Sequence, residues 1–595
     1  MTAKAVTAKA VRFRRLSFSA IVGVALAACG GGEAAGPTPP PPPPAPTVQK
    51  VAVTPGSVSI SPGDTVRFTA IPQDASGNPV SATNITWSSS PQTIATVSSS
   101  GLLTAIAAGT ATVTASVGNI SGTASVVIQQ LVSPGSARTI ELSYPTAFLA
   151  RGQPLQLAAT LRDSAGNILT GRVLAWTSGN PAIVRVDGSG SAGNLTAAGV
   201  GTTTVTGTVD GVSATSTITV VAFASIGVGP TISCAITTDG RLYCAGSGYG
   251  AAAQPVGRSL RFSAVSSNGE GPGGVAQICG LVTDGSAYCW GDNSSGQLGV
   301  GDLNSRAEPA QVAGDLHFAS ISVGRDYACG LTTGGDAFCW GAGSTGQLGT
   351  GTSSSSMVPV AVQADLKFSQ LEAGSGTTCG LSTSGKAYCW GRNDLGQLGM
   401  GPASGGQIGD QSLSPVSVGD PLASSVLKQI VTRGPKTCAL TSEGKAYCWG
   451  NNTVFELGTT TAGVNCYGGK RCSLFPTAVN SSATFTSLTA SQFATCGIAS
   501  SGETLCWGMD YERLFGAENV PACGTSGTSF GCTATPVQGA SGFLTLSGSR
   551  SNTCGMKSDG IVYCWGGNAF GQRGWGGFDP DPTPQPFSIN PASAP

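Results

Sequence analysis

The sequence is poor in charged residues and histidine, and each shortage excludes a class of protein. Charged residues make up 10% of the 595 residues, with 30 basic and 30 acidic side chains, against about 25% in an ordinary soluble domain. Zero net charge leaves no basic surface of the kind that binds nucleic acid. A single histidine, His317, and the absence of a C-x2-C spacing argue against a zinc site. Hydrophobic residues still amount to 40%, so we expect a folded chain.

Catalytic and cofactor-binding patterns are also scarce. The sequence has neither a phosphate-binding loop nor a dinucleotide fingerprint. A Ser/His/Asp or Cys/His unit would have to use His317, which is more simply a strand-edge side chain beside Phe318. Four acids lie at the tips of predicted hairpins, where the turn explains them: Asp239, Asp284, Glu443 and Asp559. We expect no catalytic residue, cofactor or metal. A glycan-active enzyme is an alternative, and it would need paired carboxylates in a central pocket.

The apolar run at residues 16–28 is too short for a permanent membrane-spanning helix. It follows a basic region that includes Lys4, Arg14 and Arg15, as in a secretory signal peptide. The run ends in Leu26-Ala27-Ala28-Cys29, which resembles the cleavage box of bacterial lipoproteins. This resemblance implies a signal peptide over 1–28, a lipid on Cys29 and an exported protein anchored at the outer membrane or cell surface. An ordinary secretory signal is the alternative. The proline-rich residues 29–47 form an extended linker.

Residues 48–221 contain an internal repeat at an offset of about 89 residues. Asp74-Ala75-Ser76-Gly77-Asn78 returns as Asp163-Ser164-Ala165-Gly166-Asn167, and Trp87 returns as Trp176. Each copy has alternating Val, Thr and Ile residues between turn signals, which predicts two small β-sandwiches over 48–130 and 136–221. These segments resemble the group 2 bacterial Ig-like domains of surface proteins and adhesins. They serve either as spacers or as binding modules.

Cysteine pairs ten residues apart recur seven times in the rest of the chain. A glycine stands six residues after each first cysteine, which suits a three-residue hairpin loop such as Thr283-Asp284-Gly285. Counting back from this loop places Cys279 directly opposite Cys289, on a rung where the Cβ atoms come close. The spacing therefore predicts one cross-strand disulfide in each hairpin. The seven predicted disulfides join Cys234 to Cys244, Cys279 to Cys289, Cys329 to Cys339, Cys379 to Cys389, Cys438 to Cys448, Cys496 to Cys506 and Cys554 to Cys564.

Both faces of these hairpins are apolar, so each hairpin is expected to lie between neighbours, as a propeller blade does. Tyr288-Cys289-Trp290-Gly291 with Gly296-Gln297-Leu298-Gly299 resembles the repeats of the regulator of chromosome condensation family. This resemblance implies a seven-bladed β-propeller over 222–590. The fold class is therefore all-β, with two sandwiches before a propeller. The strand that begins at Phe223 is expected to complete the last blade and so close the ring.

Four cysteines remain outside the hairpins, and three long insertions lie at one point of the repeat. We predict disulfides between Cys466 and Cys472 and between Cys523 and Cys532, with a zinc site as the alternative. The insertions, at about 401–420, 459–475 and 517–535, should emerge on one rim of the ring. In and beside them are aromatic and cationic residues typical of interfaces, which are candidates for partner binding: Tyr467, Lys470, Arg471, Phe475, Tyr511, Arg513 and Phe530.

The order of the modules predicts a monomeric, lipid-anchored surface or periplasmic protein whose propeller binds an unknown protein or glycan. The family resemblance also implies two regulatory alternatives. The eukaryotic founder is a guanine-nucleotide exchange factor and chromatin binder, roles that do not suit an exported, disulfide-linked chain. A secreted bacterial propeller of the family inhibits β-lactamases, which makes enzyme inhibition a further alternative.

Overall fold

The computed structural model describes residues 47–82, 84–129, 135–188, 190–268, 276–401, 411–460, 464–515, 530–550, 552–578 and 583–592. The predicted signal peptide, Cys29 and nearly all of the proline-rich linker lie outside the described residues. Two compact units are present, Met1–Ser133 and Pro134–Pro595. Strands dominate both, which confirms the all-β fold class. In the described part of the chain, no helix has the length and apolar character needed to cross a bilayer.

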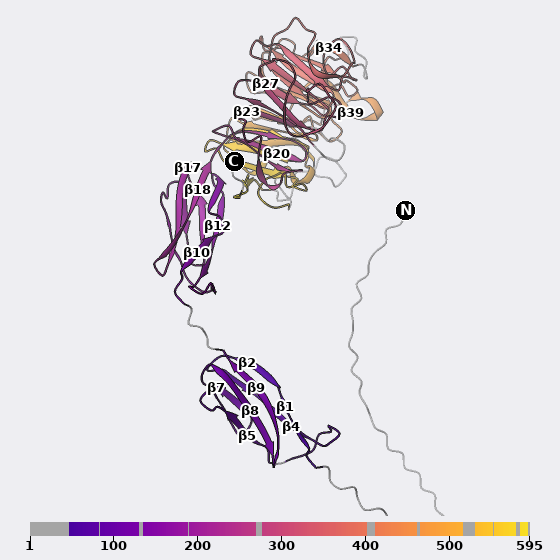
Figure 1. Ribbon diagram of the computed structural model, residues 1–595. Coiled ribbons are helices and arrows are strands. Elements are labelled where there is room, and N and C mark those ends of the chain that lie inside the picture. Colours follow the sequence, from indigo (N-terminus) through magenta and orange to yellow (C-terminus); the bar gives the residue numbers. More distant parts are fainter. Residues whose placement is uncertain are drawn as a thin grey trace, which may run out of the picture. The chain divides into compact units, whose positions relative to one another are not determined.

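The first unit contains an Ig-like β-sandwich (Figure 1). Its four-stranded sheet is formed, in spatial order, by β2 (Ser57–Ile60), β9 (Ile120–Ile128), β8 (Gly109–Val117) and β5 (Thr86–Ser90). A second sheet contains β3 (Thr65–Arg67), β7 (Leu102–Ala105) and β6 (Ala95–Val97), and β1 (Lys50–Thr54) pairs with β4 (Thr69–Gln73). Alternate residues of β8 and β9 point inward, so Val113 and Val126 are buried with Phe68.

The second unit begins with a matching sandwich. One sheet contains β11 (Thr146–Ala150), β18 (Val212–Val221), β17 (Gly201–Val209) and β14 (Ala175–Ser178). The other contains β10 (Thr139–Leu142), β12 (Pro154–Arg162), β16 (Ala192–Ala197) and β15 (Val184–Asp187), with β13 (Ile168–Leu169) paired to β12. The repeated turn is the same in both copies, because Asp74 and Asp163 each accept a hydrogen bond at 2.9 Å from the backbone N–H four residues later.

The remaining described residues form seven sheets in sequence, the blades of a propeller. Blade one contains β19 (Phe223–Val228), β20 (Ile232–Thr237), β21 (Leu242–Gly246) and β22 (Gly250–Val256). Blade two contains β23 (Phe262–Asn268), β24 (Gln277–Val282), β25 (Ala287–Gly291) and β26 (Arg306–Gln311). Blade three contains β27 (Phe318–Val323), β28 (Tyr327–Thr332), β29 (Ala337–Gly341) and β30 (Ser356–Ala361). Blade four contains β31 (Phe368–Ala373), β32 (Thr377–Ser382), β33 (Ala387–Gly391) and β34 (Ser412–Ser417). Blade five contains, in spatial order, β35 (Leu427–Arg433), β36 (Lys436–Thr441), β37 (Ala446–Asn451), β39 (Arg471–Ala478) and β38 (Val464–Asn465). Blade six contains β40 (Phe485–Ala490), β41 (Ala494–Ala499), β42 (Glu503–Met509) and β43 (Phe530–Ser541). Blade seven contains β44 (Phe543–Gly548), β45 (Asn552–Lys557), β46 (Val562–Gly566) and β47 (Gln585–Pro586). The first strand of each blade contacts that of the next, and β19 also contacts β44, so the ring is closed.

The hairpin register is the one that the cysteine spacing predicts. In blade two, Cys279 pairs with Cys289, Leu281 pairs with Ala287, and Gly285 has a positive φ of 87° at the tip of the loop. The register brings the two cysteine Cα atoms of every hairpin to 4.0–4.1 Å from each other.

All seven predicted hairpin disulfides are present in the structure. They are Cys234 with Cys244, Cys279 with Cys289, Cys329 with Cys339, Cys379 with Cys389, Cys438 with Cys448, Cys496 with Cys506 and Cys554 with Cys564. The structure also joins Cys466 to Cys472, as predicted. Cys523 and the side chain of Cys532 lie outside the described part, so their pairing stays a prediction.

The glycine after the first cysteine makes room for an aromatic ring of the neighbouring strand. Tyr288 lies opposite Gly280 in the hairpin register. A Cβ on Gly280 would lie 2.6 Å from the ring of Phe262 on the neighbouring first strand. Gly330 and Phe318 repeat this contact in blade three at 2.5 Å. Glycine therefore allows the phenylalanine of the inner strand to lie across the hairpin.

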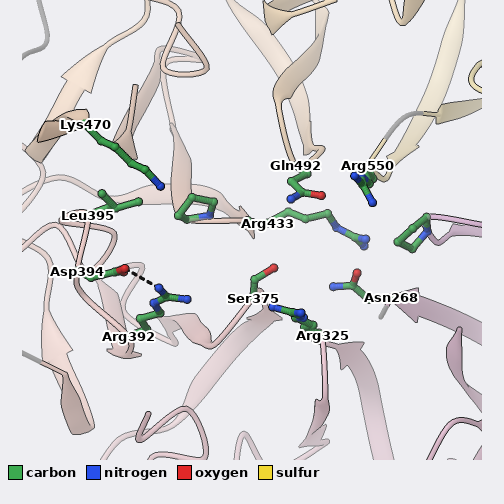
Figure 2. A pocket seen from close by; sticks show the side chains of 13 residues that line it. Asn268, Arg325, Ser375, Arg392, Asp394, Leu395, Arg433, Lys470, Gln492 and Arg550 are labelled. Carbon is green, nitrogen blue, oxygen red and sulfur yellow. Dashed lines mark hydrogen bonds and ion pairs between the residues drawn. The ribbon is translucent and has the colours of Figure 1, made fainter. Parts of the chain in front are cut away.

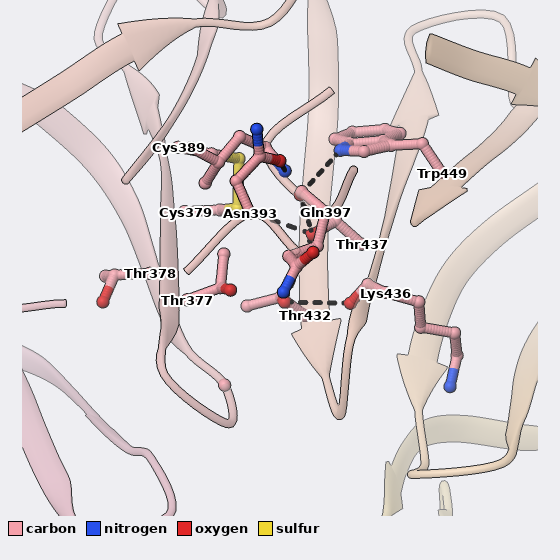
Figure 3. Close-up of a disulfide and its surroundings, with 12 residues drawn as sticks. Thr377, Thr378, Cys379, Cys389, Asn393, Gln397, Thr432, Lys436, Thr437 and Trp449 are labelled. Carbon is pink, nitrogen blue, oxygen red and sulfur yellow. Dashed lines mark hydrogen bonds between the residues drawn. A yellow bond between two sulfur atoms is a disulfide. The ribbon is translucent and has the colours of Figure 1, made fainter. Parts of the chain in front are cut away.

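The Gly-Gln-Leu-Gly segment is a packing element between blades. The Trp449 indole N–H of blade five donates to the Gln397 carbonyl of blade four at 3.0 Å (Figure 3). A Cβ on Gly399 would lie 2.5 Å from the Trp449 ring nitrogen, so this position has to be glycine. Trp340 and Trp390 bond in the same way to the corresponding Gln carbonyls of the preceding blades. The motif therefore fixes blades two, three and four each to the blade that follows.

The ring does not close through a strand lent to the last blade. That prediction is wrong, because β19 pairs with β20 in the first blade and the last blade has its own inner strand, β44. The inner strand begins each repeat rather than ending it. The C-terminal segment contributes to closure instead: the Ala253 N–H of β22 donates to the Ser588 carbonyl at 2.9 Å, and the Asn590 N–H donates to the Ala253 carbonyl at 3.0 Å.

The second Ig-like domain packs against the propeller within the same unit. The buried Gln153 side chain accepts a hydrogen bond from the Ile589 N–H at 2.9 Å and donates to its carbonyl at 2.8 Å. The Arg151 guanidinium donates to the Asp559 carbonyl at 2.9 Å, at the tip of the hairpin of blade seven. This domain therefore contacts the propeller on the side that carries the hairpin tips.

Candidate functional site

The first strands of the blades line a central channel, and polar side chains bridge them. A cavity of about 220 Å³ lies among these strands. Side-chain groups bond to the backbone of the next blade at six junctions, by the pairs Ser266 with Val323, Ser322 with Ala373, Gln370 with Ile430, Gln429 with Leu488, Thr489 with Gly548, and Ser547 with Val228. These bonds fix the positions of the loops at the end of the channel.

A second cavity, of about 300 Å³, lies at the channel's mouth. All seven blades contribute to its lining at or just after the end of their first strand, and Arg392, Asp394, Leu395 and Lys470 complete it. In six blades the lining residue stands four positions before the first hairpin cysteine: Pro230, Arg325, Ser375, Gly434, Gln492 and Arg550. In the second blade it is Asn268, the last residue of β23. We call this cavity the mouth, and the side of the propeller on which it opens the mouth face.

The mouth gathers cations in a chain whose net charge is zero. Arg325, Arg433 and Arg550 line it together with Arg392 and Lys470. Asp394 is the acidic side chain among the described lining residues, and it is paired with Arg392 at 2.6 Å. Figure 2 shows Arg433 extending toward Asn268 and Arg550, while Lys470, Arg392 and Asp394 lie at the other end of the view.

Arg433 connects the mouth to the channel, where it faces Glu372 of β31. Burial lowers the pKa of Arg433 to about 10, against the effect of Glu372, so it is protonated at neutral pH. Burial raises the pKa of Glu372 to about 7, while hydrogen bonding with Gln370 and the charge of Arg433 oppose that rise. The pair thus places a cation at the mouth and a carboxyl that titrates near neutrality in the channel.

The predicted rim residues are only partly brought together at this site. Lys470 lines the mouth, and the exposed Phe475 packs against Gly401. The others lie elsewhere on or beside the insertions. Arg471 lies over the Phe455 ring at 5.5 Å, Tyr511 contacts Phe493 at 5.6 Å between ring centroids, and Arg513 is exposed. Tyr467 lies in η2 (Tyr467–Gly469) and Phe530 begins β43, but their side chains are outside the described part. The insertions and the mouth share one face because antiparallel strands return every second loop to the same side.

His317 and the four hairpin-tip acids lie on the opposite face. The His317 ring nitrogen is 2.9 Å from the Asp284 carbonyl oxygen, beside the hairpin tip. The acids bond within their own turns: Asp239 to Thr237 and Arg241, Asp284 to Ser286, Glu443 to Ser442, and Asp559 to Ile561. These contacts agree with the turn interpretation of the acids.

Sequence reasoning missed most of the mouth, although a signal was present. Arg325 and Arg550 occupy the same position of the repeat, four residues before a hairpin cysteine, and Arg433 is one residue further back in its own repeat. An alignment of the repeats on their cysteines would have placed these arginines on one ring of loops.

The chain matches family models at both of its parts. The model of the bacterial Ig-like domain (group 2) matches residues 47–128 and 136–220. Two models of the regulator of chromosome condensation (RCC1) repeat match residues 284–331 and 334–381, and residues 318–347, 368–397, 437–455 and 545–572. The protein therefore combines two bacterial Ig-like domains of group 2 with a propeller of RCC1 repeats. Domains of these kinds are typically non-catalytic.

Individual relatives cover parts of the chain. Ice-binding protein 1 of Shewanella frigidimarina is 31% identical over 186 residues, 31% of this chain and 20% of that protein. The chain thus spans about a fifth of the length of this relative. Prp20p of Saccharomyces cerevisiae (17% identity, 55% of this chain, 80% of that chain) and human WBSCR16 (19%, 57%, 85%) have TM-scores of 0.46 and 0.48. At such scores we draw no function from them.

The disulfides and the bacterial Ig-like domains together indicate an extracellular location. Disulfides persist in oxidising compartments and are rare in the cytosol. The domain composition is that of a surface binding protein.

Proposed function

We propose that this protein is a lipid-anchored surface protein, held to the outer membrane or cell surface through Cys29, that recognises a protein or glycan with the mouth face of its propeller. The observation that carries the proposal is the position of Lys470. This residue belongs to the long insertion of blade five, yet it lines the same cavity as the loops of all seven blades. The described part of the blade-five insertion therefore belongs to the same surface as the mouth.

The attachment of the second Ig-like domain supports this assignment. Arg151 holds the hairpin-tip side of blade seven through the Asp559 carbonyl. The mouth face lies on the opposite side of the ring, where the domain does not cover it. Because the second Ig-like domain contacts the face opposite the mouth, the mouth stays open to a partner outside the cell.

Reversal of one charge at the mouth should weaken attachment to a target surface by about tenfold or more, the loss of one good interface contact. We expect this of Lys470→Glu in the chain without its signal peptide, measured by flow cytometry on cells of the producing organism. Lys445→Glu is the matched control, because Lys445 is exposed at the hairpin tip of the same blade. Equal binding by Lys470→Glu and the unmodified chain would refute the assignment of this face.

A further inference from the structure

Four guanidinium groups line the mouth, and three of them, those of Arg325, Arg433 and Arg550, are not paired with Asp394. Asp394, the acidic side chain among the described lining residues, is engaged by Arg392. Like charges held together in a partly enclosed site repel one another, and the potential that they create attracts an anion. Guanidinium groups bind carboxylates through paired hydrogen bonds, which point charges such as ammonium groups do not offer.

Two donors at this site have no partner among the described residues. Asn268 is only 6% exposed, and its side-chain Nδ2 has no hydrogen-bond partner in the described part of the chain. The same holds for Nη1 of Arg433, whose other terminal nitrogen donates to the Ser267 carbonyl at 3.4 Å. Ser267 precedes Asn268, so both orphaned donors lie at one end of the mouth (Figure 2). Buried donors without acceptors are rare in folded proteins and indicate a missing partner.

The size and remaining lining of the mouth indicate what carries the anion. A volume of about 300 Å³ exceeds what a carboxylate alone would fill and lies at the lower limit of small-molecule sites. The amide side chains of Asn268 and Gln492 and the hydroxyl of Ser375 lie beside the guanidiniums. Such groups bond to hydroxyls as well as to charges. A sugar ring that carries a carboxylate presents both kinds of group within one residue.

We propose that the mouth binds a uronic-acid-type residue of an acidic glycan, with Arg433, Arg325 and Arg550 around the carboxylate and Asn268 and Gln492 beside the sugar hydroxyls. This deepens the proposed function, on which it rests, by naming the chemistry of the partner. The site needs no metal or reaction, since every contact is a hydrogen bond or an ion pair.

The test is calorimetric titration of the whole chain, without its signal peptide, with a purified trigalacturonate. Binding should be saturable, and full methyl esterification of the sugar should abolish it. Replacing Arg433 with glutamine should weaken binding about 10- to 100-fold, as expected for loss of a charged hydrogen bond. Because Arg433→Gln alone would leave Glu372 without its cation, the variant is made together with Glu372→Gln. Arg325→Gln should weaken binding as well, and because Arg325 is exposed, this substitution should leave the packing of the core unchanged.

The control is Lys428→Gln, which removes one positive charge from an exposed position at the other end of β35. An equal loss in this variant would show general attraction of charge and overturn the site. Binding of triglutamate or inorganic phosphate, but not of trigalacturonate, would overturn the sugar assignment. If the purified trigalacturonate does not bind but attachment to cells still depends on Lys470, only the proposed ligand is rejected. If trigalacturonate does not bind and attachment to cells is also independent of Lys470, the assignment of the mouth face is rejected altogether.

Discussion

Replacement of Trp449 by alanine should lower the free energy of unfolding of the propeller by about 3–5 kcal/mol, the usual cost of removing a large buried aromatic side chain. Trp449 is fully buried and packs with Leu398, Leu422 and Leu427 between blades four and five. Its indole N–H also satisfies the Gln397 carbonyl. The substitution therefore leaves a cavity at a junction that the ring needs for closure. It also removes one of the two hydrogen bonds that the Gln397 carbonyl accepts, the other being donated by the Thr437 hydroxyl at 3.0 Å.

The measurement is chemical denaturation followed by far-ultraviolet circular dichroism, which does not depend on the fluorescence of the removed residue. Phe578→Ala serves as the control, because this aromatic side chain is 59% exposed and its loss should change stability by less than about 0.5 kcal/mol. A similarly small change for Trp449→Ala would show that blade contacts at the Trp-Gln junction do not hold the ring together.

The local structure of the blades could be predicted from the sequence because a hairpin is governed by short-range rules. Residues alternate between the faces of a strand, and the glycine fixes the loop, so a spacing of ten residues places two cysteines opposite each other. The number of blades followed from counting these units. The pairing of Cys279 with Cys289 required no information from outside the repeat.

Contacts between repeats could not be predicted in the same way. The space above Gly280 is filled by Phe262, which belongs to the neighbouring strand and reaches the glycine because of a bulge between Phe262 and Ala264. The point at which each repeat begins was predicted wrongly for a related reason. A strand between two hairpins can pair with either of them, and the sequence alone does not show which pairing forms. The assignment of β19 to the last blade was wrong on this account.

The candidate site depends still more on the closed ring. Asn268 and Arg550 are separated by most of the propeller sequence, and they line one cavity because the seven blades surround one axis. Lys470 was found because it lies in a conspicuous insertion. Arg433 was missed because its segment has the ordinary length of a blade loop, so nothing marked it except its position in the repeat.

As the pH rises from about 5 to 7.5, the free energy of unfolding should fall because of Glu372, and Glu372→Gln should remove that decrease. Burial raises the pKa of this carboxyl from 4.5 to about 7 in the folded chain. Below pH 4.5 the folded and unfolded chains both carry the proton, so its stabilising effect is fully present. As the pH rises toward 7 the unfolded chain ionises first, and stability falls by up to about 3 kcal/mol.

The test compares the denaturation midpoints of the two chains at pH 5 and pH 7.5, and parallel changes in both would contradict the prediction. The groups that face Glu372 are Arg433 across the channel and Tyr327 of blade three, and Tyr327 stays protonated because burial raises its pKa. Ionisation of Glu372 therefore acts mainly on Arg433, whose charge it partly neutralises. Since Arg433 reaches the mouth, an anion should bind there more tightly at pH 6 than at pH 8, and Glu372→Gln should make binding independent of pH over this range.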